Sequence, residues 1–150
     1  MSAALDPEDW ALWAAMTTMR ASVERALEQR LQRDAAVSLA DFDVLRGLAS
    51  AEGHRLRAGA LAETLGWEKS RISHQVKRMA DRGLLERTSC PTDGRGTWVA
   101  LAAAGADAFA AASCGYAEVL HETFFDRLST TEKRLLRGVA DRSAGASVGA

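Results

Sequence analysis

The stretch from Ala58 to Gly83, "AGALAETLGWEKSRISHQVKRMADRG", constrains the fold more than any other part of the sequence. Its first half favours a short helix that ends at Gly66, because glycine readily adopts the left-handed conformation found at helix C-termini. A second amphipathic run follows at once and ends at Gly83. Two helices joined by a tight glycine-containing turn predict a helix-turn-helix.

Two runs of extended character follow this pair of helices. They are "LLERTS", from Leu84 to Ser89, and "TWVAL", from Thr97 to Leu101. The loop between them contains Pro91 and the pair Asp93-Gly94, which are strong turn signals. A β-hairpin directly after a helix-turn-helix predicts a winged helix-turn-helix.

Longer helical patterns lie on both sides of this portion. Asp6 and Pro7 suit a helix start, and apolar residues then recur at helical spacing to about Arg33. Ser38 and Asp41 have capping-box spacing, as do Ser129 and Glu132. A long alanine-rich helix is predicted over 102–127.

The predicted fold class is therefore mainly α with a small β-hairpin, in a single domain over 1–150. A winged helix-turn-helix over 38–101 is flanked by helices over 5–33 and 102–142, and 143–150 form a disordered tail. The flanking helices have no second domain to cover their apolar faces. We therefore expect them to be dimerisation helices that pair with a second copy of the chain.

Charge is distributed unevenly along the chain. The formal net charge is −1, yet Gly53–Trp98 contains nine Lys or Arg and five Asp or Glu, a local charge of +4. The remainder of the chain is correspondingly at −5. A basic middle between acidic flanks predicts a local surface that binds a polyanion.

The predicted helix over 69–82 has two unlike faces. At about 100° per residue, one side carries apolar residues and the opposite side a polar stripe: Ile72, Val76 and Met79 against Arg71, His74, Gln75, Arg78 and Arg82. Arginine matches two acceptors on guanine, glutamine can pair with adenine, and Ser70 suits a contact near the helix start. Such a face can also be merely solvated, but the adjoining turn and hairpin favour double-stranded DNA as the partner.

Other classes of protein lack support. The sequence contains no Ser-His-Asp order, Gly-rich phosphate loop or HExxH pattern, so we expect no enzyme. The three histidines are too scattered for a metal site, and no cofactor is implied. Two cysteines and the acidic N-terminus without an apolar segment predict a reducing cytoplasmic location and no membrane.

The segment "LAETLGWEKSRISHQVKRMADRGLLERTSCPTDGRGTWVALAAAG" resembles the winged helix of the MarR family of bacterial transcription regulators. The resemblance implies a homodimer, usually a repressor, on a pseudo-palindromic operator, with the 69–82 helix in the major groove. It also implies that Asp93 pairs with an arginine to shape the wing and that Arg95 contacts the minor groove. Two positions depart from the family: Ala102 replaces a Thr or Ser cap, and Glu68 stands where Ser or Asp is common.

Many members of this family are released from DNA by small aromatic or phenolic ligands, and Trp10, Trp13 and His121 are candidates to bind one. A place in the dimer core is the plainer interpretation of the two tryptophans. Cys90 is a candidate redox sensor, although a simple hairpin residue is the plainer interpretation. Cys114 is expected to be a small core residue. A cysteine-based redox regulator and an effector-free architectural DNA binder remain alternatives.

Overall fold

The computed structural model describes residues 4–89 and 96–146, and these fall into two compact units. One unit comprises Met1–Val23 with Ala117–Ala150, and the other comprises Glu24–Tyr116. Two helices contribute to both units: α1, Pro7–Ala35, and α5, Ala103–Thr123. Within the described residues, no helix is both long enough and apolar enough to span a bilayer.

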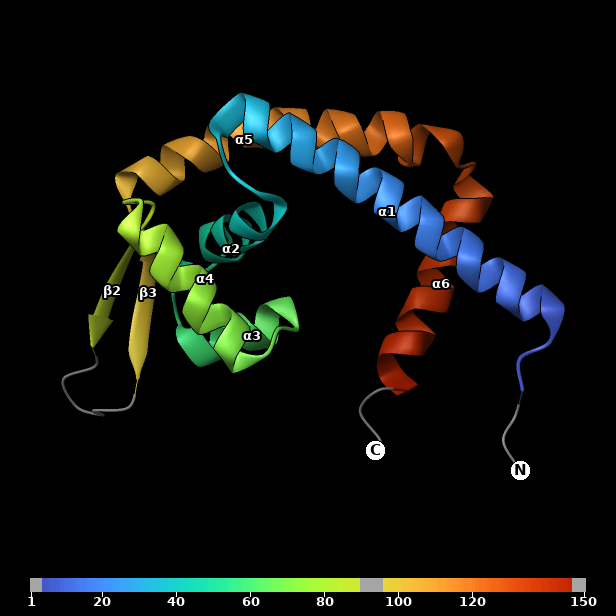
Figure 1. Cartoon of the computed structure of the whole chain (residues 1–150), viewed down its shortest axis with the longest axis horizontal. Coiled ribbons are helices and arrows are strands. Elements are labelled where there is room, and N and C mark those ends of the chain that lie inside the picture. The colour runs from blue at the N-terminus through green and yellow to red at the C-terminus, as the bar shows by residue number, and fades with distance from the viewer. Residues whose placement is uncertain (1–3, 90–95, 147–150) are drawn as a thin grey trace. The chain divides into compact units, whose positions relative to one another are not determined.

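The second unit holds the winged helix. Its further elements are α2 (Leu39–Ala49), a 3₁₀ turn (η1, Glu52–His54), β1 (Arg55–Arg57), α3 (Ala58–Leu65), α4 (Lys69–Asp81), β2 (Leu85–Ser89) and β3 (Thr97–Leu101). Figure 1 shows α3 and α4 side by side, with β2 next to α4 and β3 beside β2. The predicted fold class, with its helix-turn-helix and its hairpin, is confirmed.

The sheet has one strand more than the predicted hairpin. Its order is β1-β3-β2, and both pairings are antiparallel, with Leu56 opposite Val99 and Ser89 opposite Thr97. The stretch that begins "GHRLR" predicts a brief extended segment before α3, but its sequence does not show that this segment pairs with β3. The strand forms here because β3 offers it a free edge.

The core of the winged helix is apolar, and its buried residues come mainly from α1, α2, α3, α4, β2, β3 and α5. Fully buried side chains include Leu31, Phe42, Leu45, Leu48, Leu61, Ile72, Met79 and Val99. The ring of Phe42 stacks on Tyr116 of α5, with 4.4 Å between centroids, and on Phe109 at 5.4 Å. Burial of these side chains on α2, α4 and α5 fixes the orientation of α4.

The step from β3 to α5 depends on a close approach. The N–H of Ala102 donates to the carbonyl oxygen of Leu84, 3.1 Å away. A Cβ added at Gly105 would lie 2.1 Å from the same oxygen, which is far inside van der Waals contact. Glycine is therefore required at this position.

The other unit contains the first part of α1, the end of α5, a 3₁₀ turn (η2, Phe125–Arg127) and α6 (Thr130–Ala146). Large apolar side chains exposed on the described chain all belong to this unit: Leu5, Trp10, Leu12, Trp13, Met16, Met19, Leu135, Leu136 and Val139. Helices with such faces are stable only when another surface covers them.

Three predictions about helices are wrong in detail. The long helix predicted over 102–127 ends at Thr123, and the 3₁₀ turn η2 occupies Phe125–Arg127. The tail does not begin at Ser143, because α6 continues to Ala146; adding residues to a formed helix is favourable where alanines occur. Cys114 is exposed and not a core residue, because the buried side of α5 runs through Ala112, Gly115 and Val119.

Candidate nucleic-acid interface

The turn between α3 and α4 sets the direction of α4. Gly66 ends α3 in the left-handed region, with φ 65° and ψ 32°. The N–H of Trp67 then returns to the carbonyl oxygen of Ala62 at 2.9 Å. Glu68 is the N-cap residue of α4 in an extended conformation, and its side chain makes no capping hydrogen bond. The backbone alone therefore forms this turn.

Helix α4 is anchored through one face and exposed on the other. Ile72, Val76 and Met79 are buried in the core. Ser70, Arg71, His74 and Arg78 are exposed, as their positions in the sequence predicted. The exposed side therefore offers two guanidinium groups, an imidazole and a hydroxyl to any partner of the helix.

The predicted exposure of Gln75 is wrong. Its relative exposure is 3 %, and its amide nitrogen Nε2 donates to Oδ1 of Asp41 at 2.6 Å. Gln75 follows Ile72 by three positions and precedes Met79 by four, so it lies beside the buried face. A polar residue can occupy that position because Asp41, on α2, satisfies it. We therefore do not assign Gln75 a contact with a base.

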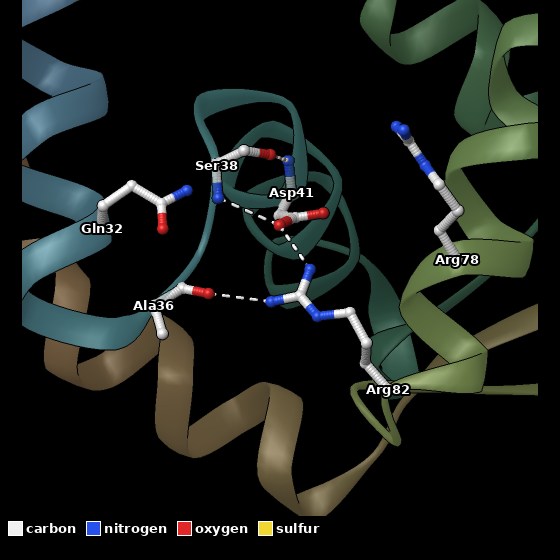
Figure 2. A pocket seen from close by; sticks show the side chains of 6 residues that line it. All are labelled: Gln32, Ala36, Ser38, Asp41, Arg78 and Arg82. Carbon is white, nitrogen blue, oxygen red and sulfur yellow. Dashed lines mark hydrogen bonds and ion pairs between the residues drawn. The ribbon is translucent and has the colours of Figure 1, made fainter.

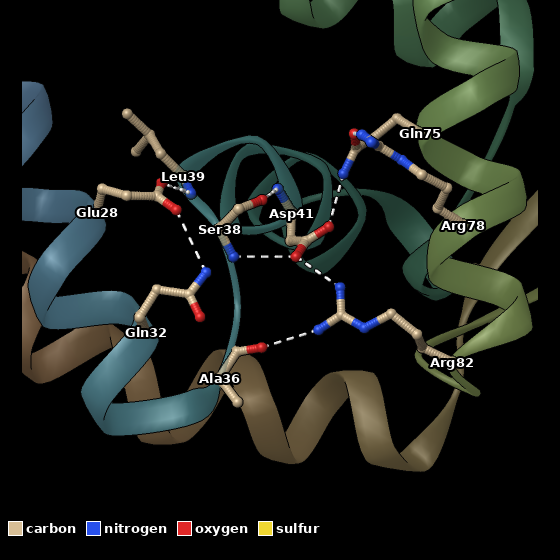
Figure 3. A network of polar contacts seen from close by, with 9 residues as sticks. All are labelled: Glu28, Gln32, Ala36, Ser38, Leu39, Asp41, Gln75, Arg78 and Arg82. Carbon is tan, nitrogen blue, oxygen red and sulfur yellow. Dashed lines mark hydrogen bonds and ion pairs between the residues drawn. The ribbon is translucent and has the colours of Figure 1, made fainter.

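Asp41 is the centre of a polar network that joins α2 to α4 (Figure 3). Its exposure is only 4 %, and its Oδ2 accepts from Nη1 of Arg82 at 2.7 Å and from the N–H of Ser38 at 2.9 Å. The N–H of Asp41 donates to the Ser38 hydroxyl at 3.0 Å, which completes the predicted capping box. A buried carboxylate needs such partners, since an uncompensated one is costly.

The same network reaches the end of α1. Glu28 accepts from the N–H of Leu39 at 2.6 Å, and Gln32 donates to Glu28 at 3.2 Å. Nη2 of Arg82 donates to the carbonyl oxygen of Ala36 at 2.8 Å. Polar contacts therefore tie the end of α1, the start of α2 and the end of α4 to one another.

A cavity of about 490 Å³ lies beside this network. Its walls are Gln32, Ala36, Ser38, Asp41, Arg78 and Arg82, and Figure 2 shows both arginines reaching toward it from α4. Two guanidinium groups face one carboxylate there, and that carboxylate is already bonded to Arg82. The cavity consequently has a positive wall at Arg78.

A second cavity, of about 580 Å³, opens between the starts of α3 and α4. Arg57, Lys69 and Ser73 line it, together with Gly59 and Glu63. Beside it, the guanidinium groups of Arg55 and Arg57 lie 4.9 Å and 5.4 Å from the ring centroid of Trp98. This basic site was not predicted from the sequence. The signal that could have indicated it is the alternation of Arg55 and Arg57 with Leu56, as expected for residues on the outer face of a strand.

The remaining basic residues of α4 differ in how they are held. The guanidinium group of Arg71 stacks over Trp67, 3.7 Å from the ring centroid. Lys77 pairs with Asp81 at 2.8 Å, and a hydrogen bond and the charge of Lys77 hold the pKa of that carboxyl below its usual value. Arg71 is therefore supported in place, whereas Lys77 is directed along its own helix.

The winged helix is similar in sequence to a known protein family. Residues 37–96 match the model of the MarR family. No curated protein sequence is significantly similar to the chain.

Solved structures extend the likeness to the flanking helices. Sco3205, a MarR family transcriptional regulator from Streptomyces coelicolor solved with DNA, is 28% identical, with a TM-score of 0.90 over 95% of this chain and 90% of that chain. AbsC, a MarR family regulator from Streptomyces coelicolor, is 25% identical, with a TM-score of 0.91 over 99% and 100% of the two chains. The organohalide-sensing regulator RdhR-CbdbA1625, bound to 2,4-dichlorophenol, shares the fold at 23% identity, with a TM-score of 0.84 over 95% and 82%.

Several predicted site residues do not belong to α4. Trp10 and Trp13 are 58% and 61% exposed, and His121 contacts Asp126 at 3.1 Å; all three are in the unit formed by the outer helices, and none lines either cavity. Asp93, Arg95 and Cys90 lie outside the described residues. In the part of the chain that is described, no three His, Cys, Asp or Glu side chains gather as metal ligands would.

Proposed function

We propose that the chain is a sequence-specific DNA-binding transcription regulator that acts as a homodimer and represses from a pseudo-palindromic operator. The observation that carries the proposal is the geometry of α4. Its apolar face is buried in the core, while Arg71, His74 and Arg78 project outward from this second helix of the helix-turn-helix. A helix held in this way can present its side chains to base edges in a major groove.

Different residues would serve different kinds of contact. We assign base reading to Arg71, His74 and Arg78, since arginine pairs bidentately with guanine. We assign phosphate contacts to Ser70 at the start of α4 and to three residues that line the second cavity, Arg57, Lys69 and Ser73. The proposal keeps Asp93 as the residue that shapes the wing and Arg95 as the minor-groove contact, as in the MarR family.

Dimerisation is supported by the outer helices. Their exposed apolar side chains include Trp10, Trp13 and Leu136. A second copy of the chain is the occupant that fits, because a two-fold pair of winged helices matches a two-fold operator. The region 5–33 and the region 102–142 are thus the proposed dimerisation helices. The tryptophans are in this account dimer core and not ligand contacts.

Selection of bound sites from random duplex DNA tests the function. The expected outcome is a pseudo-palindrome whose half-sites are separated by about 10 base pairs from centre to centre. Enrichment of no sequence, despite salt-dependent binding, would contradict a regulator and favour an architectural DNA binder. We also propose that the protein acts in the cytoplasm and is not an enzyme.

We further propose that a small aromatic anion releases the protein from DNA. The cavity of about 490 Å³ has a size common for small ligands, and its Arg78 and Arg82 suit a carboxylate or phenolate. A ligand there would compete with DNA for Arg78. Gel shifts with a panel of aromatic acids should show release that is lost in Arg82→Ala; release by peroxide, lost in Cys90→Ser, would instead support the redox alternative.

A further inference from the structure

We propose that Asp41, a residue of α2 outside the DNA-reading face, positions Arg78 for that reading by acting through Gln75. This inference rests on the proposed DNA binding. Asp41 and Gln75 are 34 positions apart in the sequence, and both are buried beneath the exposed face of α4. Asp41 touches no DNA in this account and is a positioning residue.

The first step is the orientation of the Gln75 amide. An ionised carboxylate only accepts hydrogen bonds, whereas a glutamine amide has one donating end and one accepting end. Because Oδ1 of Asp41 faces Gln75 at 2.6 Å, the NH₂ group must turn toward Asp41. The carbonyl oxygen Oε1 then faces the opposite way.

The second step is the hydrogen bond between Gln75 and Arg78. Nη2 of Arg78 donates to Oε1 of Gln75, so the accepting end of the amide holds the guanidinium group (Figure 3). Arg78 itself is exposed. A guanidinium group carries five N–H donors, so a single bond to Gln75 leaves enough donors for a bidentate pair with a base.

The third step concerns the cost of ordering Arg78. A long exposed side chain loses rotamer freedom when it binds, and a side chain that is already held loses less. Arg82 and Ser38 immobilise the other oxygen of Asp41, at 2.7 Å and 2.9 Å. The position of the Arg78 guanidinium group therefore depends, through Gln75, on the buried carboxylate of Asp41. Three residues bond to that carboxylate: Ser38, Gln75 and Arg82.

A double-mutant cycle tests the relay. The affinities of wild type, Asp41→Asn, Arg78→Ala and the double variant are measured at one salt concentration against the selected operator and all its single base-pair variants. Asparagine keeps the size of aspartate but presents only one accepting oxygen. Asp43→Asn is the matched control, because Asp43 is on the same helix and pairs with Arg46 at 3.2 Å.

Asp41→Asn is expected to weaken operator binding about ten-fold, the size of one good base contact. It should flatten base preference at the same operator position as Arg78→Ala, and it should cost much less in the Arg78→Ala background. Asp43→Asn should leave affinity and preference unchanged. Additive effects, or an unchanged preference at the Arg78 position, would overturn the inference.

Gln75→Met separates the relay from a loss of folding. It keeps the length of the side chain and leaves Asp41 bonded to Arg82, yet it removes the acceptor for Arg78. Base preference should flatten at the same position while the melting temperature stays near that of Asp43→Asn. Retained preference in a folded Gln75→Met variant would refute the relay. Absence of any preferred sequence for the wild type would instead refute the proposed function itself.

Discussion

At the scale of single residues, three arginines of α4 and its C-cap have different neighbours and hence different roles. Arg71 stacks on Trp67, Arg78 is bonded to Gln75, and Arg82 pairs with the buried Asp41. A planar guanidinium group suits all three settings. The first two are available to DNA, whereas Arg82 stabilises the fold.

Replacing Arg71 by alanine should weaken binding to the selected operator by about 1–3 kcal/mol and relax preference at one base pair. The reason is loss of a guanidinium group that Trp67 already holds in place. Fluorescence anisotropy against single-base operator variants measures both effects. Lys77→Ala is the matched control, since its ammonium group pairs with Asp81, and it should not change preference. Equal losses on every sequence would contradict base reading by Arg71.

The exposed residues of α4 could be predicted from the sequence, but the role of Gln75 could not. Helical spacing placed Arg71, His74 and Arg78 outward, and the structure agrees. Gln75 lies at the border of the buried face, where a polar residue is stable only with a partner. That partner, Asp41, is 34 positions away, and no local pattern in a single sequence indicates such a pair.

At the scale of elements, short contacts between backbone atoms decide where α5 begins. The oxygen of Leu84 accepts from Ala102 and also lies where a side chain at Gly105 would have to be. The same logic applies further along α5, where a Cβ at Gly115 would meet the Arg30–Asp34 ion pair of α1, 2.2 Å from Oδ2 of Asp34. Both glycines let α5 approach its neighbours closely.

Gly105→Ala should therefore lower the free energy of unfolding, by about 1–3 kcal/mol, because the added methyl group overlaps the Leu84 carbonyl. Urea denaturation followed by circular dichroism gives the value. Gly59→Ala in α3 is the control: its Cβ would meet nothing within 4 Å, and it should raise the free energy of unfolding by about 0.5–1 kcal/mol. Wild-type free energies of unfolding for both variants would contradict the close approach of Gly105 to the Leu84 carbonyl oxygen.

Helix α6 should lose stability in acid. Glu132 accepts from the Ser129 hydroxyl at 2.7 Å and from its N–H at 2.8 Å, and these hydrogen bonds lower the pKa of the Glu132 carboxyl. Its pKa is thus lower in the folded than in the unfolded chain. The contribution is present above the unfolded pKa and disappears as pH falls through the folded pKa. The protection of α6 amides against hydrogen exchange, taken relative to the intrinsic exchange rate at each pH, should fall over that range in wild type and show no such step in Glu132→Gln.

The order of elements was predictable because each has a local cause, whereas the pairing of β1 with β3 and the helix ends were not. Helical periodicity and glycines located α3 and α4, and the turn residues around Asp93 located the hairpin. Strand β1 exists only because β3 accepts it as a neighbour. The break after Thr123 likewise lies in a stretch whose residues alone favour a continuous helix.

At the scale of the whole molecule, polar and apolar surfaces are separated. The winged helix buries its apolar residues within itself, while the unit of outer helices leaves Trp10, Trp13 and Leu135 exposed. Among the described residues, the winged helix therefore covers its own apolar core, whereas the helical unit leaves large apolar side chains exposed. A second copy completes the helical unit in the proposed homodimer.

Trp13→Glu should convert the dimer to monomer, because a charge placed in an apolar interface is buried without a partner. Sedimentation velocity across a range of concentrations gives the species present. Glu52→Arg, an exposed charge reversal in the winged helix, should remain dimeric. Wild type that is monomeric at every concentration would contradict the dimer proposal, as would a stable dimer of Trp13→Glu.

The central claim is that α4, a helix anchored in the core, reads the base sequence of DNA. The most direct test compares the affinity of the wild-type protein for its selected operator and for a scrambled duplex of equal length and composition, at one salt concentration. The account predicts at least about 10³-fold tighter binding to the operator. Equal affinity for the two duplexes would contradict it.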